Sequence, residues 1–465
     1  MDEEIDDEMK GREDITSSDH SYKTKDLLKF LIPSLIGLTM FLLPIPRDGT
    51  LTIIVGVIHD WLQLVLESFL PYIGMGIVTF SGAFTLFSVA FKPSFVKNND
   101  FLNKLFIVGP VWSISRFIGA VFIVMTVLEI GPEVITSMAT GGTPALVLIP
   151  ILVSLFLFMS FVIALLTDFG LMEYVGTLAR VVMKPLFTIP GRASIDALAS
   201  WLGSPSVGVV ITRNQHEEGY YSDRGASVIS TTFSLVGIGY IYVMAEIVDL
   251  PGMYFQLLFS TYVVSIILAM IMPRIWPLSR IKEDYYPESG KKIKEERPSG
   301  ISLHSWALRT AVEKAKSSKI YDIIKTGYET LGIVYMSALP LVMAWGTLAL
   351  IVAEYTPVFD WIAYPFGWIL ELIGVPEAFE TGTAFVLAFP DQFLAGVVGS
   401  TLESPVSRFM AAGISITGLI YLSEIGVLIL DSTIPLDIKD LTIIYFERAF
   451  FSVFLLAPFA FFFAG

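Results

Sequence analysis

The chain has 465 residues, of which 54% are hydrophobic and 16% charged, and its formal net charge is −14. This composition predicts a polytopic membrane protein, because a soluble surface needs far more charge, and its acidity argues against nucleic acid as a partner. The absence of cysteine excludes disulfides, iron–sulfur clusters and cysteine nucleophiles, and the four scattered histidines argue against a histidine-rich metal site. We therefore expect no bound cofactor and no metal.

In chain order, residues 1–22 are expected to form a disordered acidic tail. This tail lacks the basic start and apolar core of a signal peptide. Beyond it, about nine runs hold the roughly 20 apolar residues that a helix needs to cross a bilayer. These predicted spans are residues 27–46, 71–91, 104–130, 144–166, 222–248, 253–272, 330–353, 403–430 and 441–463.

Residues 50–70 form an apolar run of a different kind. It is interrupted by His59, Asp60, Gln63 and Glu67, so we predict a helix that lies in the membrane interface. A tenth span is the alternative, but it would place the lysines of residues 92–104 on the outer side.

Basic residues are unevenly distributed along the chain. Residues 274–325 hold 12 of the 30 basic residues, whereas the 82 residues between Lys325 and Arg408 hold none. Because basic residues collect in short cytoplasmic loops, this contrast predicts a topology. We expect an integral protein of the cell (inner) membrane with a cytoplasmic N-terminus.

One order of parts occurs twice. Segments 170–188 and 357–372 are predicted interfacial helices, and each is followed by a polar, glycine-broken stretch, residues 191–216 and 376–401. Both stretches suit re-entrant hairpins, which membrane proteins tolerate only when they are buried in protein or line a cavity. The two copies enter from opposite sides, so the pattern predicts an inverted repeat, an architecture typical of secondary transporters.

This pattern divides the chain into five parts. They are the acidic tail (1–22), N-terminal scaffold helices (23–143), the first repeat (144–272), a cytoplasmic linker with a basic surface helix at residues 306–324 (273–327), and the second, inverted repeat (328–465).

The second predicted hairpin contains Asp391 and Gln392 side by side in an apolar, glycine-rich stretch. An acid at membrane depth is costly and is a functional candidate by default. Asp391 suits a sugar hydroxyl, a sodium ion or a proton, and Gln392 both donates and accepts hydrogen bonds. The span that follows adds two further candidate substrate ligands, Ser415 and Thr417, and a candidate coupling acid, Glu424.

The first predicted hairpin contains Gly203, Ser204 and Ser206 around Pro205. Glycine and proline at a hairpin tip free backbone carbonyls and amides that can hold an ion or a polar ligand. We assign Ser204 and Ser206 to the substrate and Gly203 to the coupling ion. The span that follows carries Ser230 and Thr231, which are also candidate ion ligands, although hydroxyls in spans often bond back to their own helix.

The doubled order of interfacial helix, hairpin and broken span resembles the core of the concentrative nucleoside transporters. Asp391-Gln392-Phe393-Leu394-Ala395-Gly396 is similar to their Asn-Glu-Phe-Val-Ala-Tyr motif, with acid and amide exchanged. Gly203-Ser204-Pro205-Ser206 keeps only the glycine of their Gly-Gln-Thr-Glu motif, so the side chains that read the nucleobase there are missing here. Residues 346–359 and 374–378 more closely resemble the YjiH-type proteins of the nucleoside-recognition (Gate) superfamily, which implies a transport role without identifying the solute.

We predict ion-coupled secondary transport of a small polar solute, nucleoside-like first, driven by Na+ or H+. Two alternatives remain: a non-transporting Gate protein in assembly or signalling, and a dipeptide or amino-acid permease. The sequence shows no paired nucleophile and base and no phosphate-binding loop, so we do not expect an enzyme. The expected partners are the solute and membrane lipid, and both a homo-oligomer and a second membrane subunit remain open.

Overall fold

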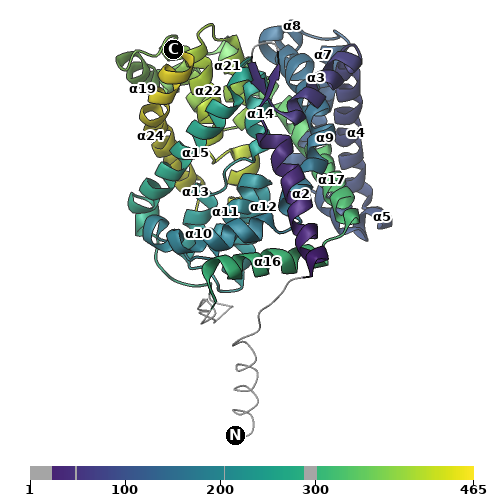
Figure 1. Cartoon of the computed structure of the whole chain (residues 1–465). Helices are drawn as coiled ribbons and strands as arrows, with labels where there is room; N and C mark the ends of the chain where they lie inside the picture. Colours follow the sequence, from purple (N-terminus) through teal and green to yellow (C-terminus); the bar gives the residue numbers. More distant parts are fainter. Residues whose placement is uncertain (1–22, 48–49, 204, 287–300) are drawn as a thin grey trace, which may run out of the picture.

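The computed structural model describes residues 23–47, 50–203, 205–286 and 301–465 (Figure 1). The expected acidic tail, the hairpin residue Ser204 and the middle of the predicted linker lie outside these ranges. The described chain is a bundle of helices, and its one small sheet is a hairpin in which β1 and β2 pair antiparallel, with Ile45 opposite Thr52.

The elements fall into three groups along the chain. The N-terminal group is α2 (Thr24–Leu42), β1 (Ile45–Arg47), β2 (Thr50–Thr52), α3 (Ile54–Leu66), α4 (Leu70–Phe91), α5 (Ser94–Lys97), α6 (Asp100–Phe106), α7 (Pro110–Val127) and α8 (Glu133–Thr136). The second group is η1 (Met138–Leu148), α9 (Ile149–Thr167), α10 (Leu171–Phe187), α11 (Ala193–Leu202), α12 (Pro205–Glu217), α13 (Asp223–Thr232), α14 (Ile238–Ile247), η2 (Pro251–Met253), α15 (Tyr254–Ile271), η3 (Met272–Arg274), η4 (Leu278–Arg280) and α16 (Leu303–Ser317). The third group is α17 (Ile320–Ile333), η5 (Val334–Ala338), α18 (Leu339–Tyr355), α19 (Val358–Leu372), α20 (Ala378–Leu387), α21 (Gln392–Thr401), α22 (Pro405–Thr417), η6 (Leu422–Gly426), α23 (Val427–Leu430) and α24 (Ile438–Ala464).

Seven helical stretches of the described chain are long and apolar enough to cross a membrane. They coincide with seven of the expected spans, and the prediction of an all-α polytopic membrane protein is confirmed. Large apolar side chains such as Phe80, Ile114 and Phe454 are exposed on these helices, as contact with lipid requires. The other two expected spans correspond to α2, which begins among charged residues, and to the broken pair α13 and α14.

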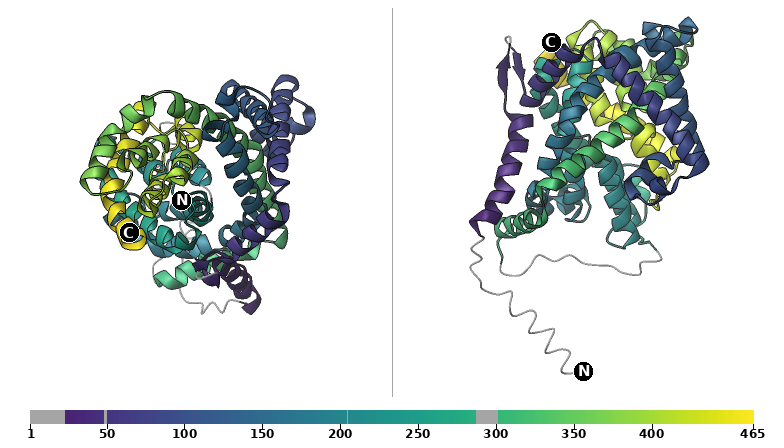
Figure 2. Two further views of the ribbon diagram at one scale, coloured as in Figure 1. Left: turned by 90° about the horizontal axis from the view of Figure 1, so that it is seen from above. Right: turned by 90° about the vertical axis from the view of Figure 1, so that its right-hand side faces the viewer.

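The N-terminal group packs against α17 and α18. The buried Arg116 side chain on α7 donates to Leu105 O at 2.6 Å and to Ser337 Oγ at 2.7 Å, which joins α7 to the end of α6 and to η5. Helices α7 and α18 approach each other so closely that a methyl group at Gly119 on α7 would overlap Pro340 O on α18. In Figure 2 (left) α24 lies on the far side of the bundle from these helices.

α3 lies at the end of the bundle opposite to the start of α2 (Figure 1). It has 13 residues and is followed at once by α4, which begins at Leu70. A helix of that length spans about 20 Å, less than the hydrocarbon core. The structure therefore agrees with the interpretation of residues 50–70 as a segment that does not cross.

Two sets of elements repeat one order in opposite directions. α9, α10, the helix pair α11–α12 and the broken helix α13–α14 form the first set, and α18, α19, the pair α20–α21 and the broken helix α22–α23 form the second. α10 lies at the end of the bundle where α2 begins, and α19 lies at the other end (Figure 1). We call the first end the basic face, after Lys23, Lys97, Lys184 and Lys316.

The predicted surface helix is present as α16, but it is shorter than expected. It packs against the start of α10 so closely that a methyl group at Gly170 would overlap Ala311 O. It also contacts α2, because Lys29 Nζ donates to Lys316 O at 2.9 Å. We expected the helix to continue to residue 324, which is wrong. It ends at Ser317, and the Asp322 carboxylate caps a new helix, α17, by accepting from Lys319 N at 2.6 Å.

Candidate functional site

Each helical hairpin contacts the interruption of the span that follows it. In the first set, Trp201 Nε1 donates to Phe233 O at 3.2 Å, and Gly237 lies so close to Gly203 O that no Cβ would fit between them. In the second set, Leu422 N donates to Phe389 O at 2.9 Å and Ser423 N donates to Pro390 O at 3.0 Å. The two hairpin tips are thus bonded to backbone that the broken spans leave unpaired.

The sequence explains why the spans break there. α14 begins after Gly237, and Gly239 follows within its first turn. The second break, residues 418–421, contains the fully buried Leu419 at φ 61°. A leucine in the left-handed region is strained and persists only where its surroundings hold it. The second break is therefore imposed by packing as well as by its glycine, Gly418.

Asp391 forms the N-cap of α21. Its Oδ1 accepts from Phe393 N at 2.9 Å, and its carboxylate also takes a hydrogen bond from Ser423. The side chain is only 5% exposed. A carboxylate at this position pairs with free amides and with the positive end of the helix dipole. The acid expected at the hairpin tip is therefore enclosed by protein and does not face lipid.

Ser415 joins the two sets of elements. Its hydroxyl donates to Gln392 O at 2.7 Å and lies 3.0 Å from the hydroxyl of Tyr240, the third residue of α14. Tyr421, at the end of the second break, donates to Ser415 O at 2.6 Å. All four residues are buried, so this contact is an enclosed junction between the second hairpin and both broken spans.

A second link joins the two sets across the first hairpin. Ser206, the second residue of α12, donates to Glu424 Oε1 in η6. Glu424 and Asp391 lie close enough to interact electrostatically, and each also interacts with the Tyr421 phenol. The hairpin tips and the span breaks therefore meet at one place in the bundle, although the residues concerned are far apart in sequence.

Arg448, on α24, lies near Tyr421 and Thr417. It is fully buried, and its Nε and Nη2 donate to Thr417 O at 3.2 and 3.0 Å. It also interacts electrostatically with Tyr421, but among the described residues no carboxylate is within ion-pair distance of it. The central cluster comprises Ser206, Tyr240, Asp391, Gln392, Ser415, Tyr421, Glu424 and Arg448.

Other predicted site residues lie near the cluster with their polar groups engaged elsewhere. Thr231 Oγ1 donates to Ser227 O in its own helix at 2.7 Å, and Thr417 Oγ1 donates to Gly413 O at 2.9 Å. Gly203 ends α11, and its carbonyl faces Gly237. Ser204 lies outside the described residues.

Three buried polar atoms at or near the breaks have no hydrogen-bond partner among the described residues. They are Ser230 Oγ, Gln392 Oε1 and Arg448 Nη1. A buried polar atom without a partner costs about 1–3 kcal/mol and more when it is charged. These three atoms are candidates to bind polar groups from outside the chain.

Arg448, Tyr240 and Tyr421 were missed by the sequence interpretation. An arginine within the apolar run of residues 441–463 is a signal in itself, because charged residues at membrane depth are rare. The two tyrosines stand in a repeated Gly-x-x-Tyr pattern, Gly237 to Tyr240 and Gly418 to Tyr421, at the two breaks. That pattern was visible in the sequence.

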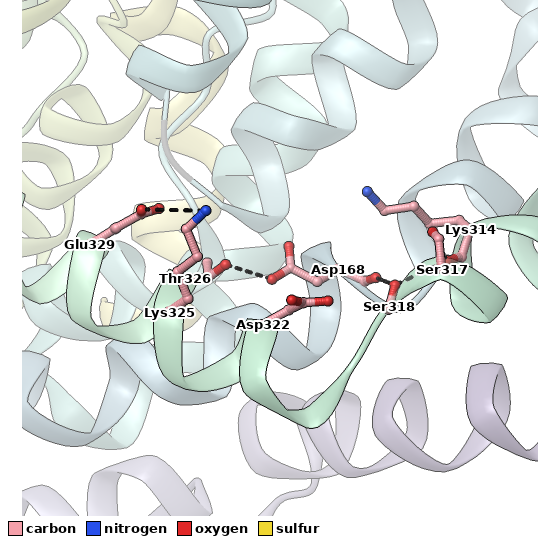
Figure 3. A pocket seen from close by; sticks show the side chains of 8 residues that line it. All are labelled: Asp168, Lys314, Ser317, Ser318, Asp322, Lys325, Thr326 and Glu329. Atoms are coloured by element: carbon pink, nitrogen blue, oxygen red, sulfur yellow. Dashed lines mark hydrogen bonds and ion pairs between the residues drawn. The ribbon is translucent and has the colours of Figure 1, made fainter. Parts of the chain in front are cut away.

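A separate polar pocket of ≈ 220 Å³ opens at the basic face (Figure 3). Its central acid, Asp168, is already satisfied, since Oδ2 accepts from Thr326 Oγ1 at 2.7 Å and the main-chain O accepts from Ser318 Oγ at 2.5 Å. Lys325 also lines this pocket and pairs with Glu329, one turn further along α17, at 3.9 Å. These bonds dock the start of α17 onto the end of α9, so we assign the pocket a structural role.

Comparison with known proteins gives the family. An uncharacterized protein from Alkalihalophilus pseudofirmus is 44% identical over 426 residues, which cover 91% of this chain and 92% of the relative. The chain belongs to the family of that protein. Residues 149–250 also match the family model Gate, which is described as nucleoside recognition. The match makes this chain a Gate-domain protein. The matched region runs from α9 to α14 and includes the first hairpin and the first break. No solved structure matches the chain.

Proposed function

We propose that this Gate-domain protein is an ion-coupled secondary transporter of a small polar solute, nucleoside-like first. The observation that supports this most directly is the central cluster, where two hairpins from opposite faces meet the interruptions of two spans. Secondary transporters build substrate and ion sites at such breaks, near the midplane between inverted repeats. The likeness to YjiH-type proteins and to concentrative nucleoside transporters forms part of the same proposal.

The proposal includes the arrangement in the membrane. α11, α20 and α21 each have ten residues, about 15 Å of helix, or half the hydrocarbon thickness. Hairpins of that length are re-entrant, and they are buried in protein here as such elements must be. The lysines and arginines at the basic face support a cytoplasmic position for that face and for the N-terminus, in a cell whose inner membrane holds the protein.

The charges of the central cluster support coupling to a cation. It contains two acids, Asp391 and Glu424, and one base, Arg448, so one negative charge is in excess when all three are ionised. Burying an uncompensated charge is expensive. A sodium ion or a proton that enters with the solute would balance it. Gly203, Ser230 and Thr231 would provide further oxygen ligands from the first set.

Solute recognition would fall to the second hairpin and the span that follows it. Gln392 Oε1 has no hydrogen-bond partner in the described chain, whereas its main-chain O accepts from Ser415. Asp391, Ser415 and Thr417 would accept or donate to polar solute groups, and Ser206 with its neighbour Ser204 would contact the other end. Closure of the hairpin tips on the breaks corresponds to an occluded state of the transport cycle.

A second candidate, a dipeptide or amino-acid permease, is favoured by Arg448. Its buried Nη1 has no partner among the described residues, and an arginine guanidinium matches the geometry of a carboxylate. A solute with a carboxylate would satisfy that atom and supply the missing counter-charge.

The test is uptake into proteoliposomes that contain the purified full-length protein. Labelled nucleosides, nucleobases, amino acids and dipeptides are offered with an inward Na+ gradient, an inward H+ gradient or neither. We expect one class to accumulate only under one gradient. Absence of uptake and of solute-induced thermal stabilisation, in protein shown to be folded, would favour the non-transporting role in assembly or signalling.

The two solute classes are separated by Arg448→Met. This substitution removes the guanidinium and keeps much of the side-chain volume, so the bundle should still fold. If the solute bears a carboxylate, uptake should fall about tenfold or more, as expected when a charged hydrogen bond worth ~1.5–3 kcal/mol is lost. Unchanged uptake of a neutral solute in this variant would instead support the nucleoside-like class.

A further inference from the structure

A second group of ionisable side chains lies outside the central cluster, at the face opposite the basic face. His59 and Asp60 on α3 and Glu246 on α14 each offer one ligand atom, and these atoms lie within 4.8 Å of one another. They line a pocket of ≈ 520 Å³ whose other walls come from α3, α9 and η1. From this geometry we propose a binding site for a divalent transition-metal cation such as Zn2+.

His59 is presented as a ligand. It is buried, and its Nδ1 lies 3.1 Å from Ser154 Oγ. The Ser154 hydroxyl has a single proton; when Ser154 donates it to Pro150 O, at 2.9 Å, the imidazole is the donor in the contact with Ser154. In that tautomer the lone pair of His59 lies on Nε2, which has no hydrogen bond among the described residues. A histidine that donates through Nδ1 and keeps its lone pair on Nε2 is a tautomer that binds metals.

The two carboxylates are held in the same way. Asp60 Oδ2 accepts from Arg47 at 2.5 Å, and Glu246 is hydrogen-bonded to the Tyr242 phenol one turn earlier in α14. Groups that hydrogen-bond to a metal ligand without touching the metal orient that ligand and tune its basicity, and natural metal sites use them regularly. Each of the three ligands has such a partner here.

The size of the site fits a small cation. Zinc binds histidine nitrogen and carboxylate oxygen at about 2.0–2.2 Å, which places neighbouring ligand atoms about 3.4 Å apart. Rotations of the side chains would close the observed separations of up to 4.8 Å to that value. The two carboxylates and Arg47 together carry one net negative charge when the imidazole is neutral, and a divalent cation more than balances it. The pocket also leaves room for a water as fourth ligand.

A cation at this site would fasten α14 to α3. The two elements already lie so close together that a methyl group at Gly56 on α3 would overlap the Tyr242 hydroxyl on α14. Tyr240, which contacts Ser415 in the central cluster, lies six residues before Glu246 on the same short helix. The site is independent of the transport proposal, and its test does not use transport.

The experiment is equilibrium dialysis of the tag-free, EDTA-stripped full-length protein against Zn2+, with bound metal measured by mass spectrometry. Co2+ replaces Zn2+ in a second series, in which the visible absorption reports the coordination. We expect about one equivalent bound tightly by the wild type. His59→Gln and Glu246→Gln should each weaken binding by about 100-fold, and Ser154→Ala, which retains all three ligands, by about tenfold.

The matched control is Glu67→Gln, which lines the same pocket without belonging to the triad. Its affinity should equal that of the wild type. Zn2+ should also raise the unfolding temperature of the wild type and of Glu67→Gln, and not of His59→Gln. The proposal is overturned if the wild type binds no Zn2+ or Co2+, or if His59→Gln and Glu246→Gln bind as the wild type does.

Discussion

At the scale of single residues, the functional candidates are polar groups that the bundle buries. Asp391 is stabilised as an N-cap and as an acceptor from Ser423, whereas Arg448 keeps one guanidinium nitrogen without a partner in the described chain. Residue types and local glycine patterns made Asp391 and Gln392 predictable. The contact of Ser206 with Glu424 was not, because it joins residues 218 positions apart, and neither residue signals the other in the sequence.

A testable consequence at this scale concerns Glu173 on α10, outside the spans. Burial raises its pKa, the nearby Asp168 acts in the same direction and Lys314 opposes them. Its Oε2 has no hydrogen-bond partner among the described residues. An acid whose pKa is higher in the folded state destabilises the protein increasingly as the pH rises from the unfolded pKa through the folded one, and the penalty then stays constant.

Glu173→Gln removes that penalty. We expect its unfolding temperature to exceed that of the wild type by roughly 1–3 °C at pH 8, and the difference to vanish near pH 4.5. Thermal unfolding in detergent at the two pH values is the measurement. Glu133→Gln, an exposed acid on α8, is the control and should show no difference at either pH. A larger gain at pH 4.5 than at pH 8 would reverse the sign and refute the argument.

At the scale of elements, local patterns predicted what local chemistry decides. The expected interfacial segments 170–188 and 357–372 are α10 and α19, because amphipathic spacing and flanking glycine or proline mark them. The C-terminal end of α16 was missed. Ser318 leaves the helix where it bonds to Asp168, 150 residues earlier, and no local signal carries such a contact.

The hairpin contacts also make a prediction at this scale. Gly237 lies against Gly203 O, so Gly237→Ala would force the first hairpin away from the break and should cost roughly 1–3 kcal/mol of stability. Gly76→Ala, at a helical position on α4 with nothing within 4 Å of the added methyl group, is the matched control and should be neutral or slightly stabilising. Thermal unfolding compares the two. Equal unfolding temperatures would mean that the hairpin does not seal the break as described.

At the scale of the whole molecule, the uneven distribution of basic residues predicted a topology, that is, which segments lie at which end of the bundle. The structure places α10 and α16 at one end and α19 at the other, in keeping with that topology (Figure 1). The convergence of two oppositely directed sets on one cluster was expected from the repeated order of parts. The composition of the cluster was only partly predictable, because Arg448 lies on α24, a span that follows the repeated order of interfacial helix, hairpin and broken span.

The membrane orientation can be measured directly because the chain has no native cysteine. Lys97→Cys places a thiol on α5 at the basic face, and Leu372→Cys places one at the end of α19, where the native side chain is 86% exposed. A membrane-impermeant maleimide should label Leu372→Cys in intact cells and Lys97→Cys only after permeabilisation. The opposite labelling pattern would invert the topology and place the N-terminus outside.

The most direct test of the central claim is gradient-driven uptake by Asp391→Asn in proteoliposomes, measured with whichever solute the wild type accumulates. Asparagine is as good an N-cap as aspartate, so the variant retains α21 and removes only the charge. The account predicts at least about a tenfold loss of gradient-dependent uptake, in line with the worth of a charged hydrogen bond. Asp431→Asn, an exposed acid just after α23, should transport as the wild type does. Wild-type uptake by Asp391→Asn, with the same dependence on the gradient, would contradict the assignment of the central cluster as the coupled transport site.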